Sequence, residues 1–161
     1  MKGRKAAMEA IKVLKKKVPG FETSKLRNFS MTLGIRDSRK IVGKYNLTGD
    51  DVCKQGRFDD SVGVFPEFVD GYAILMLPTT GRYFQVPYGC LVPDVDNLLV
   101  AGRCVSGDVL SHAATRNMMC CTVTGQAAGV AAAISIKQGQ TTQNVDIKRV
   151  QEELVRQGAR I

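Results

Sequence analysis

The chain has 161 residues, of which 44% are hydrophobic and 24% charged, as in an ordinary soluble globular protein with a modest core. Five cysteines without a CxxC pair, together with a single histidine, argue against a Cys/His zinc site, and we predict no metal. The odd cysteine count favours reduced thiols in an intracellular compartment, so we predict a cytoplasmic protein.

Positive charge is concentrated at the start of the chain. Residues 1–17 carry seven Lys and Arg side chains against Glu9, which is +6 of the net charge of +8. Such a segment is compatible with nucleic-acid binding. However, its apolar residues recur at near-helical spacing, at Met8, Ile11, Leu14 and Val18. We therefore predict an amphipathic helix over residues 4–17, ended by Pro19-Gly20, and no nucleic-acid partner.

The following segment mixes strand and helix signals. Residues 26–33 have a strand-compatible pattern, and residues 41–47 alternate in polarity, which predicts a strand with one solvated face. Thr48 is a candidate N-cap, with Asp50 and Asp51 in the first turn of a short helix.

Two further strands are predicted in the middle of the chain. They cover residues 58–65 and 83–92, and Pro87 interrupts the second. Residues 66–81 have no clear pattern and are predicted to be irregular.

The last part of the chain has a strand, a loop and a long helix in succession. Asn97–Val100 is a continuous apolar run, which is typical of a buried parallel strand. The loop after it contains Ser106-Gly107-Asp108, and the helix is predicted to begin near Asn117. A terminal helix is expected to be capped by Asp146 and ended by Gly158.

The long helix is nearly free of charge. Asn117–Ile136 is long enough to be a membrane span. Its polar and weakly apolar residues favour a buried core helix instead, and we predict no membrane partner. Gly125 and Gly129, four residues apart, are expected to let this helix lie close against a strand.

The loop between the strand and the helix carries the candidate chemistry. Ligands of open α/β sheets bind at such strand ends, and a helix N-terminus favours an anion. His112, the only histidine, is the candidate acid or base, although a structural role is the alternative. Arg116 is either an anion-binding partner or a solvated side chain. Cys120 and Cys121 are interpreted as packing residues.

Two separated blocks carry a family resemblance. "PYGCLVPDVDNLLVAGRCVSGDVLSHAATRNMMCCTVTGQAAGVAAA" and "LGIRDSRKIVGKYNLTGDDV" resemble the C-terminal portion of FAD-dependent oxidoreductases related to the fumarate reductase flavoprotein group. The similarity runs in register from about Val18 to Ala133. It implies an α/β fold in which residues 94–161 form the C-terminal strand-loop-helix of a Rossmann-like FAD-binding domain. Residues 21–93 would belong to a mixed-sheet substrate domain, after the helix of residues 1–20.

The resemblance also implies roles for particular residues. The backbone along the ribityl and pyrophosphate part of FAD would include Gly102, Arg103, Ser106 and Gly107. The start of the long helix, Asn117 and Met118, would direct its amides at the flavin pyrimidine edge. His112 and Arg116 are the candidate catalytic residues that the preceding loop supplies. Arg36 and Arg39 are expected to bind an anionic substrate or the flavin phosphates.

The chain departs from the family pattern in three places. Gly89 stands where the family usually has Arg, and Met119 stands where Pro is common. The N-terminal strand, G-x-G-x-x-G and helix of the family are missing, so most adenosine contacts would come from elsewhere.

Three functions remain open. The first is the truncated C-terminal segment of a flavoenzyme, with an N-terminal FAD-binding half or a second copy as partner and an unidentified small-molecule substrate. The second is a non-catalytic homologue that does not bind FAD alone. The third is a basic nucleic-acid-binding protein that uses residues 1–17.

Overall fold

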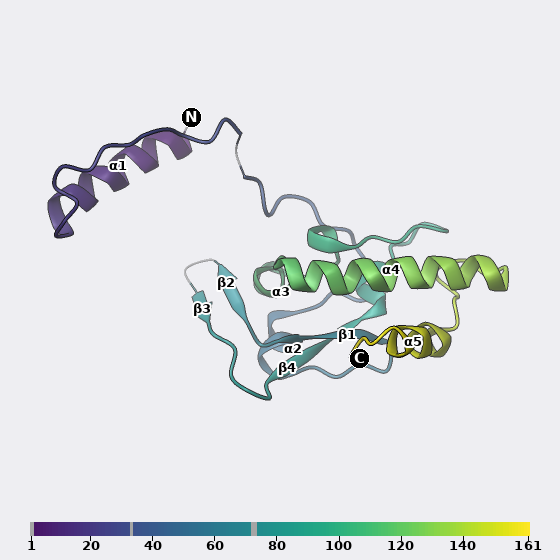
Figure 1. The fold of residues 1–161 in the computed structure, drawn as a ribbon. Coiled ribbons are helices and arrows are strands. Elements are labelled where there is room, and N and C mark those ends of the chain that lie inside the picture. The colour runs from purple at the N-terminus through teal and green to yellow at the C-terminus, as the bar shows by residue number, and fades with distance from the viewer. Residues whose placement is uncertain (1, 33, 72–73) are drawn as a thin grey trace. The chain divides into compact units, whose positions relative to one another are not determined.

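The computed structural model describes residues 2–32, 34–71 and 74–161 (Figure 1). The chain forms two compact units, residues 1–35 and residues 36–161. The second unit is mixed α/β with small antiparallel sheets, which agrees with the predicted α/β class at its coarsest level. The division at residues 20 and 93 into helix, substrate domain and FAD-binding domain stays a prediction.

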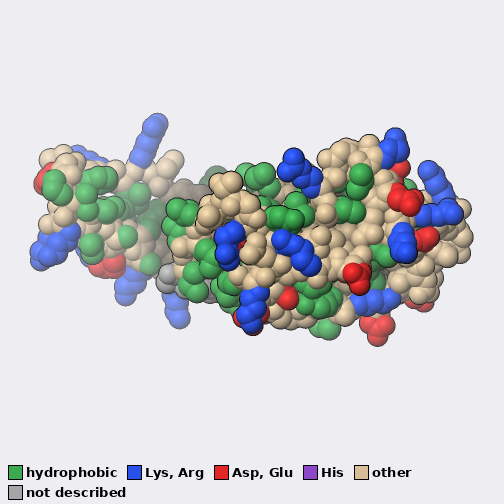
Figure 2. Space-filling view, turned by 90° about the horizontal axis from the view of Figure 1, so that it is seen from below, with side chains coloured by type: hydrophobic (Ala, Val, Ile, Leu, Met, Phe, Trp, Pro, Cys, Tyr) green, Lys and Arg blue, Asp and Glu red, His purple; other side chains and the backbone are tan. Residues whose placement is uncertain are grey.

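The first unit is built on one basic helix. Helix α1 (Lys2–Lys17) confirms the predicted helix, and none of its residues is buried. The chain turns after it at Gly20, and Arg4 lies 5.7 Å from the centre of the Phe29 ring. Figure 2 shows hydrophobic side chains between Lys and Arg side chains on the face of this unit that it presents.

The strand predicted over residues 26–33 is wrong for residues 26–32, and Leu33 lies outside the described residues. A strand requires a neighbour for its N–H and C=O groups, and the only hydrogen bonds described between backbone groups of the first unit lie within α1 or in the turns after it.

The second unit begins with an extended segment and a capped turn. The strand predicted over residues 41–47 forms only isolated bridges, Gly43 to Pro93 and Leu47 to Gly107. Its predicted alternation is nevertheless present, because the odd-numbered residues are covered and the even-numbered ones exposed. Helix α2 (Gly49–Cys53) confirms Thr48 as N-cap, and Asp51 completes a capping box with it.

The sheets are two antiparallel pairs. Strand β1 (Ser61–Pro66) pairs with β4 (Tyr83–Pro87), and β2 (Val69–Gly71) pairs with β3 (Ile74–Met76). The first pair confirms the two strand positions, and a one-turn 3₁₀ helix (Tyr88–Leu91) follows Pro87 as the chain leaves the ladder. The β2–β3 hairpin lies where an irregular segment was predicted.

The parallel strand predicted at Asn97–Val100 is wrong. These residues belong to no strand, Leu98 is exposed, and only the Val100 N–H reaches a neighbouring backbone, the Leu91 oxygen at 2.9 Å. An apolar run becomes a buried strand only when other strands flank it, and the described residues provide none beside this run. A Rossmann-like sheet is therefore not part of the described architecture.

Three helices complete the second unit, α3 (Val109–Thr115), α4 (Met118–Gln138) and α5 (Ile147–Arg156). Figure 1 shows α4 running along the β1–β4 pair with α5 beside it, and α4 and α5 both contact β1. Gly139 ends α4 with a left-handed residue, and Asp146 caps α5 by accepting the Lys148 N–H. The boundaries of α4 and α5 agree with the predicted ones. Helix α3 is a correction, because a loop was predicted up to Asn117; Asp108 accepts the Ser111 N–H and begins a helix there.

Only one face of α4 is covered. Cys120, Ala127 and Ala131 are buried against the core, whereas a Cβ added at Gly125 or Gly129 would meet nothing within 4 Å. The close strand contact predicted for these glycines is therefore absent. Among the described helices, α4 is the one long and apolar enough to cross a membrane, a test that core helices of soluble proteins also pass.

Candidate functional site

Asp108 connects the loop after residue 100 to the α2 segment by hydrogen bonds. Its carboxylate accepts the Ser111 N–H at 2.7 Å as the N-cap of α3, and the Gly49 N–H at 2.9 Å. The Asp108 N–H in turn donates to the Leu47 oxygen. Burial opposes ionisation of this carboxyl, but the backbone donors outweigh it and keep the pKa of Asp108 below its ordinary value.

The predicted FAD-binding residues of the loop divide into two places. Ser106 and Gly107 lie on the α2 side, where the buried Ser106 hydroxyl contacts the Asn46 amide oxygen at 3.2 Å. Gly102, with φ +79°, lies instead against α4 and donates its N–H to the Thr124 hydroxyl at 3.0 Å. Arg103, the next residue, is exposed and lies on the same α4 side of the loop.

Arg103 and Asn117 hold the turn between α3 and α4. The Arg103 Nε donates to the Arg116 oxygen at 3.2 Å. Asn117 occupies the N-cap of α4, but its side-chain amide donates back to the Ala114 oxygen at 2.8 Å. It therefore closes the end of α3 and leaves α4 without a side-chain cap. The α4 N-terminus, with its partial positive charge, is available to a ligand.

The structure brings His112 and Arg116 together on one helix. Both are buried, with 2% and 9% of their surface exposed. They line a cavity of about 210 Å³ with Arg36, Asp37 and Gly71. The Arg116 guanidinium also donates to the Asp70 backbone oxygen. Of the two upstream arginines predicted to bind an anion, Arg36 thus reaches this cavity and Arg39 is not among its lining residues.

The His112 ring has a defined tautomer. Its Nε2 lies 2.9 Å from the Arg36 backbone oxygen and 3.7 Å from an Asp37 carboxylate oxygen. Because a carbonyl oxygen only accepts, Nε2 carries the proton of the neutral ring. Nδ1 is then a buried acceptor, and the structure gives it no donor. Burial lowers the pKa of His112, although its contact with Arg36 opposes this, so the neutral form is favoured.

A second cavity lies at the start of α4 and was not predicted. It has about 350 Å³ and is lined by Phe65, Pro66, Phe68, Pro78 and residues 117–119. Met118 and Met119 are 80% and 72% exposed. Three of these seven residues, Pro66, Phe68 and Pro78, belong to the segment predicted to be irregular, so no sequence signal indicated the cavity.

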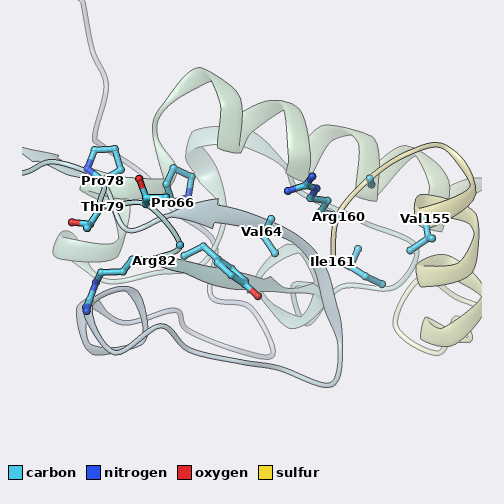
Figure 3. A pocket seen from close by; sticks show the side chains of 12 residues that line it. Val64, Pro66, Pro78, Thr79, Arg82, Val155, Arg160 and Ile161 are labelled. Carbon is cyan, nitrogen blue, oxygen red and sulfur yellow. The ribbon is translucent and has the colours of Figure 1, made fainter.

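A larger cavity, of about 840 Å³, shares Pro66 and Pro78 with the apolar cavity and no residue with the polar one. Figure 3 shows it between β1, the segment before β4 and the last residues of the chain. Its walls are mostly apolar with two basic side chains, Arg82 and Arg160. None of the predicted site residues lines it, so its size does not make it the candidate site. No group of three or more His, Cys, Asp or Glu side chains in the described part of the chain is arranged to bind a metal ion.

Comparison with known proteins identifies the family. The sequence model of the FAD dependent oxidoreductase family matches residues 1–154. No curated protein and no solved structure gave a match. The matched range spans both units and includes every residue of the two cavities at the α3–α4 turn. FAD is the cofactor of the family. The chain belongs to the FAD dependent oxidoreductases.

Proposed function

We propose that this chain is the C-terminal, flavin-side part of an FAD-dependent oxidoreductase related to the fumarate reductase flavoprotein group. The observation that carries the proposal is the uncapped start of α4, with a polar cavity lined by His112 and Arg116 before it and an apolar cavity lined by residues 117–119. FAD supplies the hydride or electron chemistry when bound.

The donors at the α3–α4 turn fit a flavin. In this proposal Asn117 and Met118 lie at the electron-rich edge of the ring, and Met118 presents its backbone N–H group, since the Asn117 N–H donates to the Ala114 oxygen. Gly102 and Arg103 face the ribityl chain and the pyrophosphate, and Arg103 contributes positive charge beside the turn. Ser106 and Gly107 support this loop from the α2 side, where they contact Asn46 and Leu47.

His112 and Arg116 form the substrate side of the proposed site. The neutral His112 ring holds one proton at Nε2 against the Arg36 oxygen, and its Nδ1 is an acceptor for a second. A base of this kind takes a proton from a substrate and returns it in the reverse direction. Arg36 and Arg116 would supply the positive charge for an anionic group in this cavity, which Asp37 also lines; an Asp70 carboxylate oxygen lies 3.6 Å from the Arg116 guanidinium.

The adenosine side of the cofactor requires a second segment. The sequence contains no G-x-G-x-x-G, and one face of α4 is open, with Ile136 80% exposed near its end. An N-terminal FAD-binding half, or a second copy of this chain, would cover that face, and the N-terminal half would bring the Rossmann-like sheet with its Gly-rich unit.

Mixing the chain with a candidate N-terminal half tests this proposal. We expect a yellow complex whose flavin absorbance exceeds the sum for the two parts measured separately. Failure to form that complex with any half that carries the Gly-rich unit would contradict the proposal.

The second candidate is a non-catalytic homologue that does not bind FAD alone. The absence of the Gly-rich unit favours it. Titration of the isolated chain with FAD distinguishes the flavoenzyme segment from the non-catalytic homologue, because micromolar binding would overturn the second candidate.

A further inference from the structure

We propose that the large cavity beside β1 binds a small molecule with an apolar body and one carboxylate, a medium-chain carboxylic acid in chemical class, and that Arg160 binds the carboxylate. The cavity volume of about 840 Å³ lies within the roughly 300–1,000 Å³ of small-molecule sites. This cavity shares no residue with the cavity of His112 and Arg116, so the proposed site is additional to the flavin site and does not depend on it.

One wall of the cavity is formed by the last residues of the chain, which fold back over β1. Gly158, with φ +87°, lets the chain turn at the end of α5, and the Ala159 N–H donates to the Leu154 oxygen at 2.9 Å. A Cβ added at Gly63 of β1 would lie 3.8 Å from the Arg160 backbone oxygen. The turn therefore holds Arg160 and its neighbours against the strand.

The opposite wall comes from the turn before β4. The Arg82 N–H donates to the Thr79 oxygen at 3.0 Å, and Gly81 between them has φ +82°. Figure 3 shows Val64 and Pro66 of β1 between the two walls. Three segments far apart in the sequence therefore line one hollow.

The lining is mostly apolar and contains no acidic residue. Val155 and Tyr83 line the cavity and are 53% and 39% exposed. A ligand with an apolar body would remove these side chains from water, which favours binding. The walls therefore match the apolar part of the proposed ligand.

The charge of the proposed ligand follows from the two arginines that line the cavity. The Arg82 guanidinium is already paired, because its Nη2 donates to the Glu67 carboxylate at 3.0 Å, and in Figure 3 it points away from the hollow. The Arg160 guanidinium points from the end of the chain toward Pro66 and forms no ion pair with any residue that the structure describes. One unpaired cation beside apolar walls therefore selects an anion with an apolar body.

The lining also favours a carboxylate over a phosphate. A guanidinium presents two parallel N–H groups that match the two oxygens of a carboxylate. Phosphate groups are typically bound by several cations or by the N–H groups at a helix N-terminus, and the lining residues supply one unpaired guanidinium and no helix start.

Isothermal titration calorimetry of the full chain with octanoate tests the inference. Octan-1-ol has the same apolar body without the charge, and inorganic phosphate has the charge without the apolar body. We expect octanoate to bind saturably at one site, octan-1-ol to bind at least about threefold more weakly, and phosphate not to compete with octanoate.

Arg160→Gln is the diagnostic variant. Because Arg160 is exposed, its loss should weaken octanoate binding by about three- to tenfold, whereas binding of octan-1-ol should not change, which shows that the cavity is intact. Arg149→Gln is the matched control, since it removes the same charge from α5 at a residue that does not line the cavity. It should leave octanoate binding unchanged.

A second pair of variants tests the location. Val155 is an exposed helix residue at the cavity, so Glu and Lys are both tolerated there. Val155→Glu should weaken octanoate binding by repulsion, and Val155→Lys should retain it.

Absence of saturable octanoate binding, equally tight binding of octan-1-ol, competition by phosphate, or equal losses in Arg160→Gln and Arg149→Gln would overturn the inference. If a yellow complex with an N-terminal half no longer binds octanoate, a segment of that half covers the cavity, and the inference fails while the proposed function stands. Octanoate binding with the expected variant effects, but without any yellow complex, would support the inference and contradict the proposed function.

Discussion

Replacing Asp108 should destabilise the second unit more than any surface substitution near it. Asp108→Ala removes the N-cap of α3, which typically costs about 0.5–2 kcal/mol. It also leaves the Gly49 N–H, now 2.9 Å from the carboxylate, without an acceptor in a buried position, which costs about 1–3 kcal/mol. Together these losses predict a decrease of about 2–4 kcal/mol in the free energy of unfolding.

Urea unfolding followed by near-UV circular dichroism measures this change. The chain has no Trp, and Tyr88, which is buried, and Tyr45, which is half-buried, report on the second unit. Asp50→Ala is the control, because it removes an exposed carboxylate from the neighbouring helix and only an exposed ion pair with Lys54. Asp108→Asn keeps a cap but has one acceptor oxygen where two are used, so it should fall between the two.

The contribution of Asp108 to stability also depends on pH in a defined direction. Because the pKa of Asp108 is lowered in the folded chain, its ionised form stabilises the fold above the ordinary aspartate pKa. That contribution is lost as the pH falls through the lowered value. A loss below about 0.5 kcal/mol for Asp108→Ala at neutral pH, or a loss equal to that of Asp50→Ala, would refute the argument that Asp108 joins the two segments.

Three other predictions use the same preparations. In an assembled enzyme, His112→Ala should cut turnover and leave flavin bound. Wild-type turnover should fall as the pH drops through the lowered His112 pKa. Unchanged turnover in His112→Ala would make His112 a structural residue. Gly63→Ala should cost about 1–3 kcal/mol, because its Cβ would lie 2.2 Å from a Val123 methyl, and Val123→Ala should restore most of that loss in a double-mutant cycle. The hydrogen bond from Arg82 lowers the pKa of Glu67, so this pair stabilises the fold above the ordinary glutamate pKa, and the stabilisation is lost as the pH falls. Arg82→Gln should flatten that part of the profile of stability against pH. An unchanged profile would contradict this prediction.

Helix boundaries were predictable because their signals are local. Thr48, Asp146 and the Gly residues after the last two helices lie within a few residues of the backbone groups that they satisfy. The alternation of residues 41–47 was likewise correct, since the side-chain direction of an extended chain alternates whatever it pairs with. These features depend on neighbours in sequence, and the sequence contains those neighbours.

The strands were less predictable because they depend on partners. Asn97–Val100 has the composition of a buried strand, yet no strand among the described residues flanks it. Gly125 and Gly129 have the spacing of a packed face, yet that face is open. In both cases the sequence indicates a surface suited to burial, and only the fold decides whether a partner is there. The β2–β3 hairpin shows the converse, since three-residue strands have too few residues for a periodic pattern.

For the site, the sequence by itself indicated which segment carries the candidate chemistry, whereas the tertiary structure decided how its residues are arranged and what they face. His112 and Arg116 were predicted to lie in a loop, but the segment forms α3, so they lie four residues apart on one face, with Arg116 as the C-cap. The buried Nδ1 without a donor, and the approach of Arg36 from 76 residues away, follow from long-range packing. So does the apolar cavity at the start of α4, whose walls also come from the end of β1 and from Phe68 and Pro78. A local pattern specifies side-chain direction, but the chain must fold before distant groups share one environment.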